Sequence, residues 1–160
     1  MEIDLVEYSR QLVEDVQINQ RKNQVGRLDV EINFITNQTQ IIGNVDERTL
    51  GHILNNLLSN AIKYSQPGTA VNFTVSSQKQ QLIFEIEDKG IGIPPEDLPF
   101  LFDAFHRCQN VGNIQGTGLG LSIVKKCLDM LQGKINVTSE VGVGTKFTVT
   151  IPLEHCCNNS

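Results

Sequence analysis

Asn56, Asn60 and Lys63 are polar residues spaced four and three positions apart in a segment otherwise rich in leucine and isoleucine. On a helix that turns about 100° per residue, they lie within about 60° of one another, along the border of the apolar face. Two amides and an ammonium grouped in this way suit phosphates and a bound cation, because amide oxygens can ligate Mg²⁺. The alternative is a solvated polar face on an amphipathic helix.

Asp88 is the second candidate, at the end of a segment with strand periodicity. It shares its parity with Leu82, Phe84 and Ile86, which turns its carboxylate toward the core. A carboxylate there is costly unless it is hydrogen-bonded or paired. The glycine turn at 90–92 follows, and glycine lets a ligand approach the backbone closely. A buried acceptor beside such a turn suits an amino group such as that of adenine, whereas the alternative is an aspartate that caps the turn.

Thr145 lies near the end of the chain and has the parity of Phe147, Val149 and Ile151, so its hydroxyl is expected to face inward. If its strand neighbours the strand of Asp88, both polar groups reach one pocket. The alternative is a threonine that makes only a backbone contact where its strand begins.

The glycine-rich stretch 116–120 precedes a predicted helix, where backbone amides freed of side chains form an anion site. It is not a P-loop, because no Gly-Lys-[Ser/Thr] follows at the required spacing, and it lacks the dinucleotide-binding spacing as well. Arg107 follows Phe102 and Phe105, which would anchor the base of a lid, and its guanidinium suits an oxyanion. The alternative for Arg107 is an ordinary surface arginine.

The elements that must position these residues follow from hydrophobic periodicity. Helices are predicted over 4–20, 46–64 and 122–131, and strands over 28–35, 71–76, 82–88, 134–139 and 145–153. Asp46 is the expected N-cap of the central helix. Helices and strands mix without a regular βαβ alternation, which predicts an α/β two-layer sandwich with helices on one face of a mixed sheet. The long glycine-rich stretch 90–120 is expected to be functional.

Composition narrows the function classes. The chain has 160 residues and a net charge of −5, which argues against nucleic acid or an anionic membrane as the main partner. No stretch approaches the roughly 18 apolar residues of a membrane span, and the acidic N-terminus is unlike a secretory signal. The four cysteines and three histidines show no metal-site spacing. A cytoplasmic domain is expected, with an anchor elsewhere in a longer parent chain left open.

Taken together, the segments 56–64, 88–94, 116–121 and 142–145 resemble the ATP-binding catalytic domain of bacterial sensor histidine kinases. That family belongs to the superfamily of DNA gyrase, the MutL proteins and a heat-shock chaperone, and the match covers roughly residues 4–153. The resemblance implies a Bergerat ATP-binding fold with about five strands, three main helices and a flexible ATP lid. It also implies a junction helix over 1–22 from a missing dimerisation domain, a catalytic domain over 23–153 and a disordered tail over 154–160.

The resemblance also implies ATP and Mg²⁺ as ligands and assigns roles to residues. Asn60 is expected to ligate Mg²⁺, Asp88 to read the adenine, and Asn56, Lys63 and Arg107 to act in catalysis. The expected nucleotide contacts are Asn56, Asn60, Lys63, Tyr64, Asp88, Gly90, Gly92, Ile93, Phe105, Arg107, Gly116, Thr117, Gly118, Leu119, Gly120, Leu121 and Thr145.

Two departures from the family pattern stand out. Gln115 occupies a position where many such kinases have glycine, which stiffens the expected lid hinge. No histidine has the His-Glu/Asp-x-x-x-Pro context of a phosphoacceptor. The dimerisation and phosphoacceptor domain is therefore expected upstream or on another chain, in cis or in trans, with a response regulator as an indirect partner.

Three rival functions stay open at this point. ATPases of the gyrase or chaperone kind carry a glutamate one helical turn before the Mg²⁺ asparagine, and Asn56 is an amide that cannot take a proton at neutral pH. Sustained ATP turnover without an acceptor would favour that class. The others are a serine kinase of the anti-sigma-factor type and a nucleotide-binding regulatory module without transfer activity.

Overall fold

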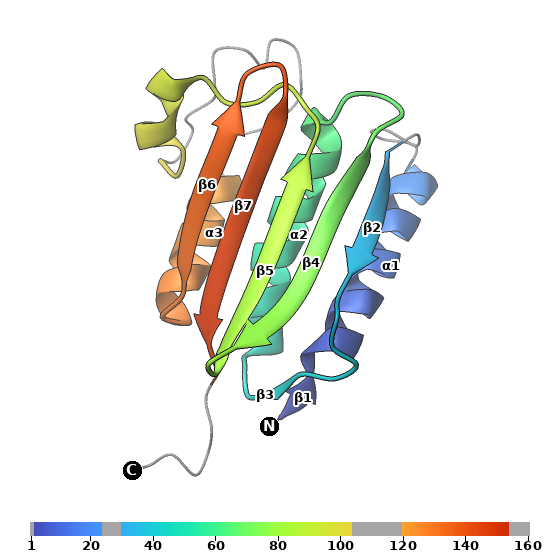
Figure 1. Ribbon diagram of the computed structural model, residues 1–160, viewed down its shortest axis with the longest axis vertical. Coiled ribbons are helices and arrows are strands. Elements are labelled where there is room, and N and C mark those ends of the chain that lie inside the picture. Colours follow the sequence, from blue (N-terminus) through green and yellow to red (C-terminus); the bar gives the residue numbers. More distant parts are fainter. Residues whose placement is uncertain (1, 24–29, 104–119, 154–160) are drawn as a thin grey trace.

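The computed structural model describes residues 2–23, 30–103 and 120–153. One five-stranded sheet carries three helices on one face (Figure 1). The strands, in spatial order, are β2 (Glu31–Ile35), β4 (Ala70–Gln78), β5 (Gln81–Asp88), β7 (Gly144–Pro152) and β6 (Lys134–Glu140), and the helices are α1 (Leu5–Asn23), α2 (Glu47–Tyr64) and α3 (Gly120–Met130). Only β2 and β4 pair in parallel within this sheet. The predicted two-layer sandwich is confirmed.

Three short elements in the described part of the chain are not predicted by the periodicity of the sequence. The strands β1 (Ile3–Asp4) and β3 (Ile42–Gly43) pair with each other antiparallel, and η1 (Pro95–Phe100) is a 3₁₀-helix. The periodicity predicts Asp4 inside the first helix, but its carboxylate accepts a hydrogen bond from Val6 N and caps that helix instead. Elements of two to six residues are too short to produce a readable period.

The central helix α2 forms as its sequence predicts. Asp46 caps it by accepting hydrogen bonds from Arg48 N at 3.2 Å and from Thr49 Oγ1 at 2.7 Å. Its stripe packs toward the sheet, and burying each leucine or isoleucine contributes about 1.5–3 kcal/mol. The buried residues of the helix are Thr49, Leu50, Ile53, Leu54, Leu57, Leu58, Ala61 and Ile62. This packing leaves Asn56, Asn60 and Lys63 at the edge of the stripe, where they are half-buried.

The β4–β5 hairpin sets the register that places Asp88. Its turn residues Lys79 and Gln80 have φ values of 53° and 63°, so the turn lies one to two residues beyond the expected position near Gln78. Two residues with positive φ form the tight turn that matches the twist of the flanking strands. In this register Asp88 is the last residue of β5 and lies directly opposite Thr145 on β7.

Candidate functional site

The predicted base-binding carboxylate lies on the buried side of the sheet. Asp88 is 8% exposed, and the residues that share its parity, Leu82, Phe84 and Ile86, are at most 1% exposed. Its Oδ1 accepts hydrogen bonds from Gly90 N at 3.0 Å and from Thr145 N at 3.2 Å. Among the described residues, both of these bonds end on the same oxygen, which leaves Oδ2 as the acceptor for a further donor.

Burial determines the acidity of Asp88. The pKa of this carboxyl is raised from 3.8 to about 6, mainly by desolvation and to a smaller extent by the nearby charge of Glu87. The hydrogen bonds from Gly90 and Thr145 act in the opposite direction and lower the pKa. The carboxylate is therefore ionised at neutral pH but held there at a cost, which is common at functional sites.

Thr145 contributes through both its backbone and its side chain. It is 7% exposed, its amide donates to Asp88, and its Oγ1 lies 2.8 Å from Ser139 Oγ. The backbone contact that the sequence left as an alternative is thus present together with an inward hydroxyl. Sequence reasoning did not single out Ser139. The signal that could have found it is the hairpin register around Gly142, which sets Ser139 opposite Thr145.

The turn after Asp88 is packed against the end of α2. A Cβ on Gly90 would lie 2.1 Å from the carbonyl oxygen of Tyr64, and Ile91 N donates to that same oxygen at 3.3 Å. Ser65 forms a bridge with Gly90, and Gln66 N donates to Lys89 O. A glycine in this turn predicts close approach of a ligand, but at Gly90 the close approach is made by the backbone of α2.

Gly92 is constrained by both its conformation and its surroundings. Its φ is +76°, and a Cβ there would lie 2.3 Å from the carbonyl oxygen of Glu140. We expect Gly92→Ala to lower the free energy of unfolding by about 2–5 kcal/mol, since left-handed strain and overpacking add. Gly68→Ala is the matched control, because Gly68 has a φ of +80° with nothing within 4 Å and should lose only about 1–2 kcal/mol. Urea denaturation measures both, and equal losses would refute the steric contact.

Asn56 and Asn60 of α2 face the start of α3. A Cβ on Gly120 would lie 3.2 Å from Asn56 Oδ1 and 3.8 Å from Asn60 Nδ2. The amide nitrogen of Asn56 donates to His52 O at 2.7 Å, which fixes the side chain and leaves its oxygen toward Gly120. The structure therefore brings the predicted polar border of α2 next to the end of the glycine-rich stretch.

The remaining predicted residues divide into described and undescribed ones. The ammonium of Lys63 lies 5.1 Å from the centroid of the Tyr64 ring. Ile93 is buried, and Phe102 and Leu121 are half-buried against the core. The others lie outside the described residues: Phe105, Arg107, Gly116, Thr117, Gly118 and Leu119.

The donor set fits a sparsely ligated Mg²⁺. Over residues 2–23, 30–103 and 120–153, no group of three or more His, Cys, Asp or Glu side chains could hold a metal. Amide oxygens on Asn56 and Asn60 offer instead the one or two protein ligands that Mg²⁺ takes alongside phosphate oxygens and water. The residues present therefore suit a cation that enters with a nucleotide.

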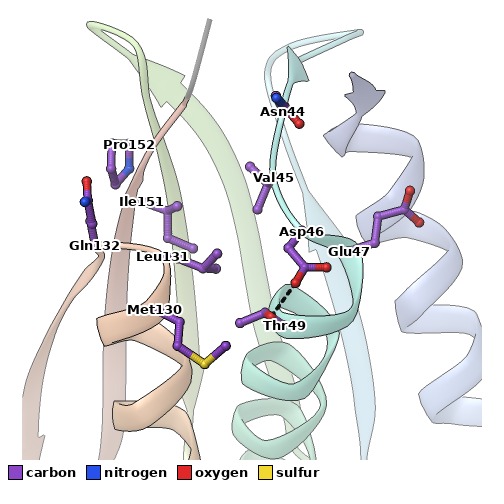
Figure 2. A pocket seen from close by; sticks show the side chains of 10 residues that line it. All are labelled: Asn44, Val45, Asp46, Glu47, Thr49, Met130, Leu131, Gln132, Ile151 and Pro152. Atoms are coloured by element: carbon purple, nitrogen blue, oxygen red, sulfur yellow. Dashed lines mark hydrogen bonds between the residues drawn. The ribbon is translucent and has the colours of Figure 1, made fainter. Parts of the chain in front are cut away.

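A cavity of about 570 Å³ lies at the other end of the helix layer and contains none of the predicted site residues. Figure 2 shows its lining, which comes from the segment before α2 and the first turn of that helix, from the end of α3 and the turn after it, and from the end of β7. The carboxylate of Asp46, which lines this cavity, caps α2 by accepting hydrogen bonds from Arg48 N and Thr49 Oγ1. In the part of the chain that the structure describes, no helix is long and apolar enough to cross a membrane.

Comparisons with known proteins agree with this geometry. The model of the family described as "Histidine kinase-, DNA gyrase B-, and HSP90-like ATPase" matches residues 45–155. The sensor histidine kinase RcsC of Escherichia coli is 42% identical over 125 residues, which are 75% of this chain and 13% of RcsC. The chain thus spans a small part of the curated relatives it matches.

Solved structures give the same result. The mycobacterial sensor histidine kinase MprB has a TM-score of 0.81 and 28% identity, covering 96% of this chain and 99% of the MprB chain. Full-length ShkA in complex with AMPPNP has a TM-score of 0.79 and 26% identity, covering 98% of this chain and 31% of that one. The likeness to sensor kinases inferred from the four segments is confirmed, and the chain belongs to the family of histidine kinase-, DNA gyrase B- and HSP90-like ATPases.

Proposed function

We propose that this chain binds Mg-ATP and transfers its γ-phosphoryl group to a histidine on a separate dimerisation and phosphoacceptor domain, in cis or in trans. The phosphohistidine then passes its phosphoryl group to a response regulator. The observation that carries the proposal is a buried carboxylate at the end of β5, on the same side of the sheet as the amide-bearing helix α2. An adenine amine suits the first and a triphosphate with its cation suits the second.

One group of residues binds the adenine end of the nucleotide, and another binds the triphosphate end. Asp88 accepts a hydrogen bond from the adenine amine, with Thr145 beside it and Gly90, Gly92 and Ile93 closing the pocket. Asn60 offers its amide oxygen to Mg²⁺, which, when bound, offsets phosphate charge. Lys63 and Arg107 hold the transferring group, and residues 116–121 close over it. Such transfers depend mainly on positioning and electrostatics.

The chemical step needs little from a general base. The imidazole of the acceptor attacks the γ-phosphorus, an N–P bond forms, and the bond to the β,γ-bridging oxygen breaks as ADP leaves. Asn56 supports transfer over hydrolysis, because an amide cannot take a proton from water at neutral pH. The side-chain nitrogen of Asn56 already donates to His52 O.

The proposal also includes the domain organisation. Residues 1–22 form a junction, residues 23–153 the catalytic domain and residues 154–160 a tail, in a cytoplasmic setting.

The first test is nucleotide preference followed by transfer. Guanine presents a carbonyl where adenine presents an amine, and an unmatched buried polar contact costs about 1–3 kcal/mol, so Mg-ATP should bind about 10- to 100-fold more tightly than Mg-GTP. Calorimetry measures this ratio. With γ-labelled ATP and a sensor-kinase dimerisation domain, the label should appear as acid-labile, alkali-stable phosphohistidine.

The rival functions predict other products. Sustained release of phosphate without an acceptor would indicate a hydrolase, and phosphoserine on a partner protein would indicate an anti-sigma-type kinase. Tight binding of Mg-ATP without phosphohistidine on any cognate acceptor domain would indicate a regulatory module. Each of these outcomes contradicts the proposed transfer.

A further inference from the structure

Ser139 on β6 lies at the centre of a hydrogen-bond cluster that joins three segments beside the predicted base pocket. Its Oγ accepts a hydrogen bond from Ile93 N at 2.7 Å. The same oxygen lies 3.0 Å from Gly144 O and 2.8 Å from Thr145 Oγ1. The cluster therefore ties the loop after β5 to the β6–β7 hairpin through one hydroxyl.

Counting protons gives the direction of each bond. A serine hydroxyl has one proton to donate and two lone pairs to accept with. Gly144 O carries no proton, so its 3.0 Å contact requires the proton of Ser139. The Ser139 oxygen then accepts from Ile93 N and from Thr145, whose hydroxyl supplies the proton for the 2.8 Å contact. If Ser139 instead donated its proton to Thr145, the oxygens of Ser139 and Gly144 would lie 3.0 Å apart with no proton between them.

The consequence is that the hydroxyl proton of Thr145 points to Ser139, and Thr145 Oγ1 retains only lone pairs for a ligand. Its direct neighbour in the β5–β7 ladder is Asp88, whose Oδ1 is taken by two backbone amides. Oδ2 of Asp88 is likewise an acceptor at neutral pH. The floor of the pocket thus presents two acceptors side by side, which matches the two N–H groups of a primary amine.

We propose that Ser139 is a positioning residue for base recognition, which holds the Thr145 hydroxyl as an acceptor beside Asp88 so that the floor accepts both hydrogens of the amino group, directly or through one ordered water. This inference rests on the proposed function, in which adenine supplies the amine. It assigns to Ser139 a share in selecting the base without touching it.

The test compares Mg-ATP with the Mg²⁺ complex of purine riboside triphosphate, which lacks the 6-amino group, by calorimetry on the intact domain. Ser139→Ala should weaken ATP binding about tenfold and leave the affinity for the purine analogue within about twofold, because only ATP carries the amine whose acceptor Ser139 positions. Ser139→Thr restores the hydroxyl and should restore the preference for ATP. Thr138→Ala is the matched control, since Thr138 is the exposed neighbour on the same strand.

A double-mutant cycle distinguishes a role of Ser139 in positioning the Thr145 hydroxyl from a general role in stabilising the fold. Thr145→Val removes the acceptor while keeping the shape, and should cause the same selective loss of ATP affinity. Adding Ser139→Ala to Thr145→Val should then cause no further selective loss, because Ser139 acts through Thr145. Thermal unfolding is followed for every variant, and if Ser139→Ala does not fold, retention of full ATP preference by Thr145→Val overturns the inference.

The outcomes distinguish the two proposals. Equal losses for both nucleotides in Ser139→Ala, additive losses in the cycle, or an unchanged ATP preference would each overturn the role of Ser139 while leaving ATP binding intact. A wild-type domain that binds the purine analogue as tightly as ATP would instead overturn the assignment of the amine to Asp88, and the inference about Ser139 with it.

Discussion

Replacing Asp88 with asparagine is expected to weaken the binding of Mg-ATP by about two orders of magnitude while the domain stays folded. The amide oxygen of asparagine can still accept the bonds from Gly90 N and Thr145 N, so the turn keeps its shape. The amide nitrogen would replace Oδ2 and set a donor against the donor of the adenine amine. Calorimetry measures the affinity, and circular dichroism checks the fold. An unchanged affinity for ATP would contradict the role given to Asp88.

The pH dependence of stability is the internal control for this variant. The pKa of Asp88 is raised from 3.8 to about 6, so the folded state favours the protonated carboxyl. The stabilisation is complete below pH 3.8 and is lost as pH rises through 6, a decrease in the free energy of unfolding of about 3 kcal/mol. Asp88→Asn should lack this decrease in urea denaturation between pH 4 and 8, and should be at least as stable as the wild type at the upper end.

Binding of ATP should show the opposite trend. Below pH 6 a proton on Oδ2 turns that oxygen into a donor facing the adenine amine. ATP affinity is therefore expected to fall as pH decreases, over the range in which the free protein gains stability from the same proton. Observing both trends would indicate that the carboxylate serves ligand binding at a cost to the stability of the fold.

Replacing Asn60 with alanine is expected to reduce phosphoryl transfer by at least about a hundredfold at limiting Mg²⁺. Even changes to residues that only orient metal ligands cost 10- to 100-fold in metal affinity or activity, and removing a ligand should cost at least as much. Raising the Mg²⁺ concentration should recover part of the rate, because the loss is one of metal affinity. Label transfer to a dimerisation domain, titrated with Mg²⁺, measures both effects.

Asn55→Ala is the matched control for Asn60→Ala. Asn55 lies on the same helix but is exposed, away from Gly120, so its variant should retain wild-type transfer. Nucleotide binding without Mg²⁺ completes the design. If Asn60→Ala loses affinity equally in the presence and absence of the metal, the residue contacts the nucleotide or supports the fold, and its assignment to Mg²⁺ fails.

Parts of the site could be predicted because they depend on local periodicity. The parity of β5 placed Asp88 inward, and the parity of β7 did the same for Thr145. The stripe and cap of α2 gave that helix to within a residue, and with it the position of Asn60. In each case one apolar face decides the orientation, since a shift of one residue would bury polar side chains.

Other parts depend on contacts between segments far apart in the sequence, which local periodicity does not reveal. Ser139 reaches Gly144 and Thr145 within the β6–β7 hairpin, but it accepts the hydrogen bond from Ile93 N only when this hairpin meets the loop after β5. The contact of Gly90 with Tyr64 likewise requires the end of α2 to reach the turn after β5. Neither a hydroxyl on a strand nor a single glycine identifies its distant neighbour, so these roles emerge only from the tertiary structure.

The bond from Thr145 N to Asp88 Oδ1 joins residues 57 positions apart. If Asp88 and Thr145 hold the base as proposed, a nascent or partly unfolded chain that has formed β4 and β5 but not β7 lacks a complete base pocket. Nucleotide can stabilise only the complete domain, because a ligand adds stability to the species that binds it. ATP thus cannot serve as a template for early folding, but it should slow the global opening of the finished sheet.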